Sequence, residues 1–336
     1  MKLSVSWLVF VASSVGANLV AAPFEFLRDG TNSVSLRENG RPVYTFQLAP
    51  RSRDGEFARA NYLHPVYDLG GRVLTEDFPA DHPHHRGIFW AWHQILVEGR
   101  PVADSWVCRD LKWLPSWTVA LSEGTAVAAD RARLEVIREW AVGDAEQRVV
   151  REYVEVIVHP TDPVRGRRMD FTIRLRALVD GVTLGGSNDD KGYGGFAPRI
   201  RLTDDVHFTG REGAVKPVKT AVEAGPWLDM TETLEGKFIG MTMMVHPGHP
   251  GFPLKWILRA KRSMQNPQWP GREPVPLSMR RDTVLRYRLL FHERRLERNE
   301  LEDEWFRYAD SYKSATIQTK EAVSRAAPSP NESAER

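Results

Sequence analysis

Residues 169–177 alternate between apolar and polar side chains without interruption. The apolar positions run from Met169 to Ala177 at every second residue, and Asp170 and Thr172 are among the polar residues between them. A β-strand places alternate side chains on opposite faces, whereas a helix would spread the same apolar residues around its whole surface. The segment therefore predicts a strand with one buried face.

Similar strand patterns recur along the chain, and turn-forming residues separate them. They are found in residues 134–140, 149–158, 200–202, 238–245 and 284–291. No helical pattern of the kind that a parallel sheet requires lies between them. We therefore predict an all-β fold, a large antiparallel β-sandwich. Helical spacing appears only near the end, where Leu301, Trp305 and Tyr308 predict a C-terminal helix.

The two ends of the chain differ from the middle in composition. Residues 1–22 combine a basic start, an apolar run and small residues, which is typical of a secretory signal peptide, with a membrane anchor as the alternative. Residues 23–313 are expected to form a single β-sandwich domain, and residues 314–336 a disordered tail. We therefore expect a periplasmic or secreted protein with no stable membrane span after signal removal.

The charge balance argues against some classes of partner. The 336 residues carry 46 basic and 44 acidic side chains, a net charge of +2, which gives no field for attracting nucleic acid. The hydrophobic fraction of 42% is ample for a sizeable core. Cys108 is the only cysteine, so an intramolecular disulfide is excluded. The expected partner is a small-molecule or carbohydrate ligand.

Titratable side chains are concentrated in residues 76–87, and a packed core would not absorb such a set. In a straight strand His82 and His84 would face one way and His85 the other, so we expect either that division or a bend at Pro83. A network of buried polar residues that shapes the loop is the structural alternative. The candidate catalytic residues are His82, His84, His85, Glu76 and Asp81.

Two later segments carry further candidates. Glycines surround a tyrosine in residues 188–196, and histidines alternate with prolines and glycines in residues 246–253. Such loops permit close approach to a ligand, and aromatic side chains offer flat faces to sugar rings, although mobile turns and core packing are the structural alternatives. The candidate substrate-binding residues are Arg86, Trp92, Tyr193, Arg199, His246, Trp256 and Asn266.

These blocks resemble a known family. Residues 76–92, 191–195 and 246–267 and the strand 284–292 are similar to successive blocks of a secreted β-rich family commonly labelled methane oxygenase PmoA, or PmoA-like. The resemblance covers roughly residues 62–292 and implies a role among carbohydrate-degrading genes, with a fold similar to the galactose-mutarotase supersandwich. Methane oxidation is not expected, because no segment after the signal is long enough to span a membrane.

We therefore expect an enzyme that acts on a glycoside or modified sugar by histidine and carboxylate acid–base chemistry. One alternative is a non-catalytic carbohydrate-binding or interaction protein, and another is a metal-dependent oxidase or lyase that uses a divalent cation. Histidines and carboxylates gathered around one cleft would favour catalysis. A flat tryptophan surface with dispersed histidines would favour binding alone.

Overall fold

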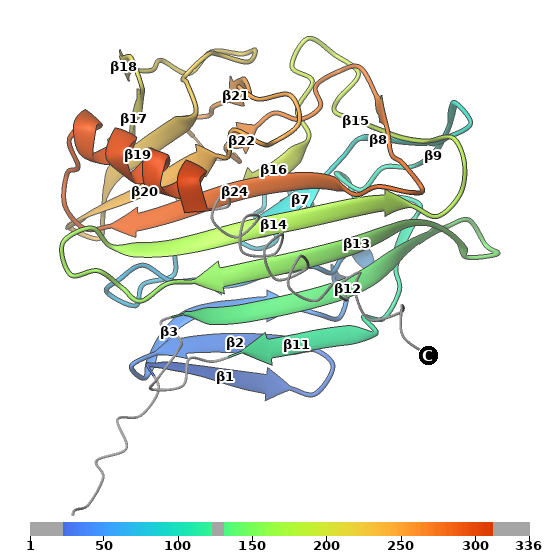
Figure 1. Cartoon of the computed structure of the whole chain (residues 1–336), viewed down its shortest axis with the longest axis horizontal. Coiled ribbons are helices and arrows are strands. Elements are labelled where there is room, and N and C mark those ends of the chain that lie inside the picture. Colours follow the sequence, from blue (N-terminus) through green and yellow to red (C-terminus); the bar gives the residue numbers. More distant parts are fainter. Residues whose placement is uncertain (1–22, 123–130, 262, 312–336) are drawn as a thin grey trace, which may run out of the picture.

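The computed structural model describes residues 23–122, 131–261 and 263–311 (Figure 1). Strands dominate these ranges, every ladder between named strands is antiparallel, and a helix spans residues 298–311. The predicted antiparallel β-sandwich with a C-terminal helix is confirmed. The predicted signal peptide and the whole of the predicted tail lie outside the described residues. Within the described ranges, no helix is long and apolar enough to cross a membrane.

One large sheet has ten strands (Figure 1). Its order is β10 (Leu111–Trp113), β12 (Ala132–Val142), β13 (Gln147–Val158), β14 (Arg167–Ala177), β24 (Thr283–His292), β20 (Lys237–Val245), β19 (Trp227–Leu234), β17 (His207–Gly210) and β18 (Gly213–Ala214), and β11 (Thr118–Ser122) pairs with β12. The long central strands are those in which the sequence alternates most regularly.

A second sheet has six strands. Its order is β1 (Phe24–Asp29), β2 (Ser33–Glu38), β3 (Arg41–Gln47), β6 (Tyr62–Val66), β7 (Ile88–Ala91) and β16 (Gly195–Pro198). Smaller sheets complete the fold: β23 (Val275–Pro276), β15 (Val182–Gly185), β8 (Gln94–Val97) and β9 (Arg100–Ala103); β21 (Trp256–Ile257) and β22 (Asn266–Pro267); and β4 (Arg51–Arg53) and β5 (Glu56–Arg59).

The main core lies between the two large sheets. Phe171 and Ile173 of β14 are fully buried in one hydrophobic cluster with Val34 of β2 and Trp90 of β7. The alternation in β14 places these side chains on its inner face, so burial of apolar surface selects the register of the strand. The apolar face that the sequence alternation gives each strand is therefore what packs into the core of the sandwich.

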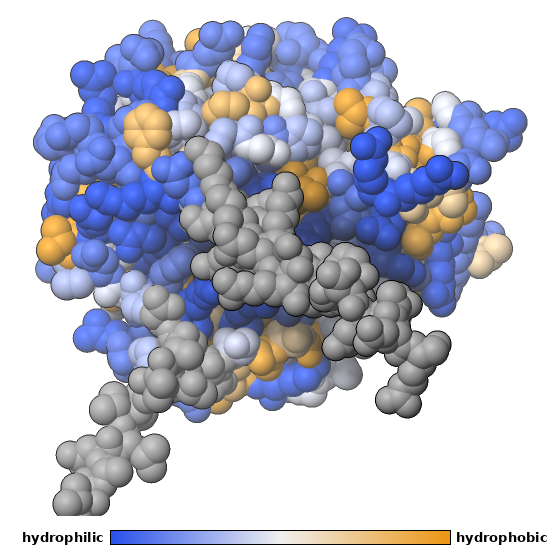
Figure 2. Space-filling view, in the orientation of Figure 1, coloured by the Kyte–Doolittle hydropathy of each residue, from blue (hydrophilic) through white to orange (hydrophobic). Residues whose placement is uncertain are grey.

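The helix 298–311 covers part of the outer face of the ten-stranded sheet (Figure 1). Its Leu301 and Trp305 pack against Met244 and Leu290 of the sheet in a second buried cluster. Glu304 on the same helix accepts a hydrogen bond of 3.0 Å from Nη1 of Arg288. The described residues that are visible in Figure 2 are largely hydrophilic.

Candidate functional site

Two tight turns fold the histidine segment onto itself. The backbone N–H of His82 donates to the carbonyl of Pro79 (3.2 Å), and that of His85 donates to the carbonyl of His82 (2.9 Å). The ring centroids of His82 and His85 lie 4.7 Å apart, those of His84 and His85 4.6 Å, and those of His82 and His84 5.7 Å. The segment is therefore bent, and its three imidazoles form one cluster, which we call the histidine cluster.

The histidine cluster lies on the side of the six-stranded sheet that faces away from the main core. Along β7, Ile88 and Trp90 belong to the main core, whereas Phe89 and Ala91 belong to a separate cluster that includes Trp106. The ring of His85 lies 5.8 Å from Phe89 and 5.9 Å from Trp106. Strand β7 is buried on both faces, which explains its continuous apolar sequence.

Arg199 holds the acidic residues of the segment in place. Its side chain is 1% exposed, and its Nε donates to Glu76 (2.6 Å) while Nη2 donates to Asp81 (2.8 Å). Its Nη1 lies 3.4 Å from Nδ1 of His85. The predicted substrate-binding role of Arg199 is therefore replaced by a positioning role, because both carboxylates and a histidine already engage its donors.

Two histidines each pair with an aspartate through Nδ1. His82 Nδ1 lies 2.8 Å from Asp81 Oδ2, and His93 Nδ1 lies 2.9 Å from Asp104 Oδ2. An ionised carboxylate only accepts, so Nδ1 carries the proton and Nε2 keeps the free lone pair when the ring is neutral. His82 is 44% exposed, and Nε2 of His93 is buried without a hydrogen-bond partner among the described residues.

The pairing also fixes the charge of Asp81. Burial raises the pKa of Asp81, but hydrogen bonds from His82 and Arg199 outweigh that effect and hold the pKa below its usual value. Asp81 therefore stays ionised at neutral pH, as a carboxylate that orients an imidazole must.

Contacts between aromatic rings connect the His82–Asp81 pair to the His93–Asp104 pair. Trp106 lies 5.9 Å from His85 and stacks on His93 at 5.4 Å, and Tyr193 lies 4.9 Å from Trp106 and 5.1 Å from His93. Burial raises the pKa of Tyr193, so its hydroxyl keeps its proton at neutral pH. A row of rings therefore runs from His82 through Trp106 to Tyr193, with a proton donor at its end.

His84 and His85 are held neutral. Desolvation lowers the pKa of His84 to about 4, and electrostatic interactions with Arg59 and His82 add to the effect. Desolvation and the neighbouring His84 also lower the pKa of His85. Within the described residues neither ring nitrogen of His84 has a hydrogen-bond partner, so this partly exposed ring offers one donor and one acceptor to a ligand.

The depressed pKa of His84 predicts acid instability. In the unfolded chain His84 would titrate near its ordinary value of about 6.5, so between that value and about 4 the unfolded state binds more protons. The contribution is therefore fully present above about pH 6.5 and is lost as the pH falls toward 4. We expect a loss of roughly 1–2 kcal/mol from His84 after allowing for its partial exposure.

Urea unfolding at a series of pH values measures this loss. His84→Gln should show a shallower decline in the free energy of unfolding than the wild type. His207→Gln, at an exposed position in β17, should decline as the wild type does. Equal slopes for His84→Gln and the wild type would contradict the assignment.

Arg86 and Trp92 have structural rather than ligand-facing positions. Arg86 is fully buried, pairs with Asp77 and donates from Nη1 to the carbonyl of Phe57 (2.8 Å). Trp92 is fully buried in the main core, and its Nε1 donates to the carbonyl of Trp269 (3.2 Å). We therefore correct the predicted substrate-binding role of both residues, because their polar groups are already occupied inside the protein.

His246 and Trp256 also serve the fold. His246 Nδ1 accepts the N–H of Gly248 (2.9 Å), and its Nε2 lies 3.1 Å from the carbonyl of Ala309, which attaches this loop to the C-terminal helix. Trp256 is fully buried and donates to the carbonyl of Gly225 (3.0 Å). The prediction that these two residues bind substrate is not supported, since the sheet and the helix engage them.

Asn266 holds the backbone of residues 188–196, which we call the glycine–tyrosine loop. Its Oδ1 accepts the N–H of Gly194 (3.1 Å), and its Nδ2 donates to the carbonyl of the same residue (2.9 Å). Tyr193 of the segment 188–196 thus joins the cluster around Trp106, whose ring also contacts His85 of the histidine segment. Ile257 and Met264, which follow the segment 246–253, belong to the same cluster, and Asn266 positions the loop that carries Tyr193.

The candidate site residues predicted from the sequence do not include His93, Asp104 or Trp106. His93 follows an apolar run directly, which is a weak signal, and Asp104 lies in no motif. Their pairing depends on the hairpin of β8 and β9, which returns the chain to the end of β7. Within the described ranges no group of three or more His, Cys, Asp or Glu side chains is placed to hold a metal ion.

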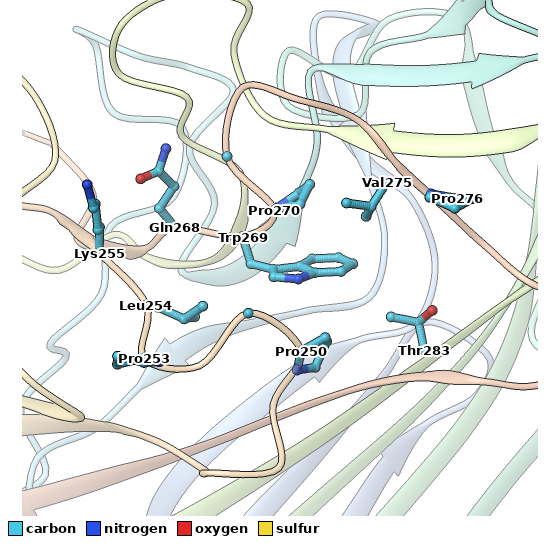
Figure 3. A pocket seen from close by; sticks show the side chains of 12 residues that line it. Pro250, Pro253, Leu254, Lys255, Gln268, Trp269, Pro270, Val275, Pro276 and Thr283 are labelled. Atoms are coloured by element: carbon cyan, nitrogen blue, oxygen red, sulfur yellow. The ribbon is translucent and has the colours of Figure 1, made fainter.

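Figure 3 shows a separate hollow of about 560 Å³, and none of its lining residues belongs to the histidine cluster. Lys255 is its one titratable lining residue, so the hollow lacks the acid and base groups that the cluster provides. Gln268 at its edge donates to the carbonyls of Lys191 and Gly192 (both 2.8 Å) and so supports the glycine–tyrosine loop. Its lining includes Pro250, Pro253, Leu254, Trp269, Pro270, Val275, Pro276 and Thr283.

Comparison with known proteins identifies a family and no activity. The sequence model of the Family of unknown function (DUF6807) matches residues 33–306. This range contains the histidine cluster, both histidine–aspartate pairs and the glycine–tyrosine loop. A search of curated proteins finds no match to the chain.

Proposed function

The chain belongs to the Family of unknown function (DUF6807), and from the geometry of the histidine cluster we propose that it is an enzyme acting on a glycoside or modified sugar by general acid–base chemistry. The single observation that carries the proposal is the presence of two carboxylate-oriented imidazoles, His82 and His93, at one row of rings. A carboxylate on Nδ1 directs the basic lone pair of Nε2 toward a substrate, which is how histidine acts as a general base.

The proposed role of each residue follows from its protonation state at neutral pH. Nε2 of the exposed His82 removes a proton from the substrate, and the resulting imidazolium, which Asp81 stabilises, returns that proton in a later step. The second pair, His93 and Asp104, holds its ring against Trp106 and Tyr193. Tyr193 keeps its hydroxyl proton and donates a hydrogen bond to substrate oxygen. Neutral His84 binds a hydroxyl through one donor and one acceptor, which suits a polyhydroxylated ligand.

A sugar is supported by three observations together. The partly exposed rings of His82, His84 and Tyr193 combine flat faces with polar atoms, and sugars present apolar faces edged by hydroxyls. Histidines and carboxylates gather at one place, and Trp90, Trp92 and Trp106 are buried, so these three tryptophans present no flat surface there. The resemblance to the PmoA-like family implies a carbohydrate setting. The signal-like residues 1–22 suit a periplasmic or secreted location.

Variants of the cluster test the proposal. Purified mature protein is first screened by thermal shift against mono-, di- and oxidised sugars, because binding stabilises the native state, and hits are followed for product formation. His82→Gln should lower kcat by about 10²–10⁴-fold, as expected when an acid–base group is removed. His84→Ala, which removes a ring that binds a substrate hydroxyl, should weaken sugar binding. His207→Gln, on exposed β17, should leave kcat unchanged.

The outcome separates the three functions. Full turnover in His82→Gln would overturn the acid–base assignment. Saturable sugar binding without any product, in both wild type and variants, would identify a carbohydrate-binding protein. Turnover that a chelator abolishes and a divalent cation restores would identify a metal-dependent enzyme.

A further inference from the structure

Trp117 is the one tryptophan among the described residues that faces solvent, with 51% of its surface exposed. It lies in the segment between β10 and β11 and lines a hollow of about 720 Å³ against the β12–β13 hairpin. Ligand sites span about 300–1,000 Å³, so the hollow is large enough for sugar units. Its other lining residues are Leu114, Pro115, Glu139, Ala145, Glu146 and Arg148.

A buried carboxylate fixes two guanidinium groups beside this indole. Glu139, whose side chain is 4% exposed, accepts from Nη1 of Arg148 (2.9 Å) and from Nε and Nη2 of Arg151 (3.2 and 3.0 Å). The guanidinium of Arg151 lies 5.2 Å from the Trp117 ring centroid. A guanidinium carries five N–H donors, so each arginine keeps donors that Glu139 does not use.

This arrangement matches a pyranose ring. The indole is 51% exposed although the guanidinium of Arg151 lies over its ring, so it still offers flat apolar surface to a sugar. Arg148, which lines the hollow, offers planar donors to the sugar hydroxyls. The charge of the hollow does not favour an anionic ligand, because Glu139 balances part of the charge of the two arginines and Lys112 pairs with Glu146 (3.1 Å). We propose that this hollow binds a pyranose unit of a neutral glycan. The proposal is independent of catalysis at the histidine cluster, to which none of the lining residues belongs.

Glycan binding to wild type and variants tests the site. The probes are cellohexaose, xylohexaose, maltohexaose and laminarihexaose, titrated by calorimetry and by tryptophan fluorescence. At least one should bind saturably, and Trp117→Ala should weaken that binding by about tenfold or more through loss of stacking. Arg148→Ala should weaken it as well, while Phe306→Ala, which removes another exposed aromatic (52%), should not.

His82→Gln distinguishes this proposal from the proposed catalysis. It should retain the glycan binding of the wild type even where turnover is lost. The proposal is overturned if no probe binds, or if Trp117→Ala binds as tightly as wild type. Binding that is lost in His82→Gln and kept in Trp117→Ala would place the glycan at the histidine cluster and overturn it as well.

Discussion

Gly87→Ala is expected to lower the free energy of unfolding by roughly 3–5 kcal/mol. Gly87 has φ +54°, and an added Cβ would lie 2.0 Å from the backbone oxygen of Leu63. Its N–H donates to the carbonyl of Glu76, and its own carbonyl accepts the N–H of Arg199, both at 2.7 Å. The backbone cannot move aside without breaking these bonds, so the variant should also disturb the histidine cluster.

Gly30→Ala is the matched control. Gly30 has φ +50°, but an added Cβ would meet nothing within 4 Å. Only the cost of the left-handed conformation remains, about 1–2 kcal/mol. Urea unfolding of both variants separates the two contributions. Equal losses would show that the close approach of Gly87 to Leu63 does not constrain the loop.

Glu152→Ala is expected to cost about 3–5 kcal/mol, because it leaves a buried cation uncompensated. Glu152 is fully buried between the sheets and accepts hydrogen bonds from Nε1 of Trp90, Nε1 of Trp140 (2.8 Å) and Nδ2 of Asn61 (2.8 Å). Nε of buried Arg138 donates to Asn61 Oδ1 (3.0 Å). Removing the carboxylate deprives three donors of their acceptor and Arg138 of its balancing charge.

The burial of Glu152 itself has a cost. Desolvation raises its pKa, although the bonds from Trp90, Trp140 and Asn61 oppose the shift. Glu146→Ala is the control, since Glu146 is exposed and its pair with Lys112 is worth about 0–1 kcal/mol. Urea unfolding followed by tryptophan fluorescence measures both variants. A loss below about 1 kcal/mol for Glu152→Ala would contradict the network.

Local sequence patterns were enough to predict much of the fold. The alternation in residues 169–177 predicts β14, and the structure contains it as Arg167–Ala177 with its apolar side buried. Helical spacing of Leu301, Trp305 and Tyr308 predicts a C-terminal helix, and the structure contains it at residues 298–311. Both patterns repeat within a few residues, because the backbone geometry of a strand or a helix determines which side chains share a face. An apolar face can therefore be recognised in the sequence without knowing which element covers it.

The candidate site was predicted only in part. The density of titratable groups in residues 76–87 identified the histidine segment, and Tyr193 was found through its surrounding glycines. His246 and Trp256 looked equally suitable in sequence but are engaged by the helix and the core. Sequence position cannot distinguish a histidine that satisfies a backbone carbonyl from one that keeps a free nitrogen, because the partner comes from elsewhere in the chain.

Taken alone, the amino-acid order determined the strands, the terminal helix and a segment rich in titratable groups, since each depends on neighbouring residues. The tertiary structure decided what these groups do. Pairing of β16 with β7 carries Arg199 to Glu76 and Asp81, and the β8–β9 hairpin carries Asp104 to His93. Hydrogen-bond partners so distant in sequence are selected by sheet order and by burial of both faces of β7, which no local pattern encodes.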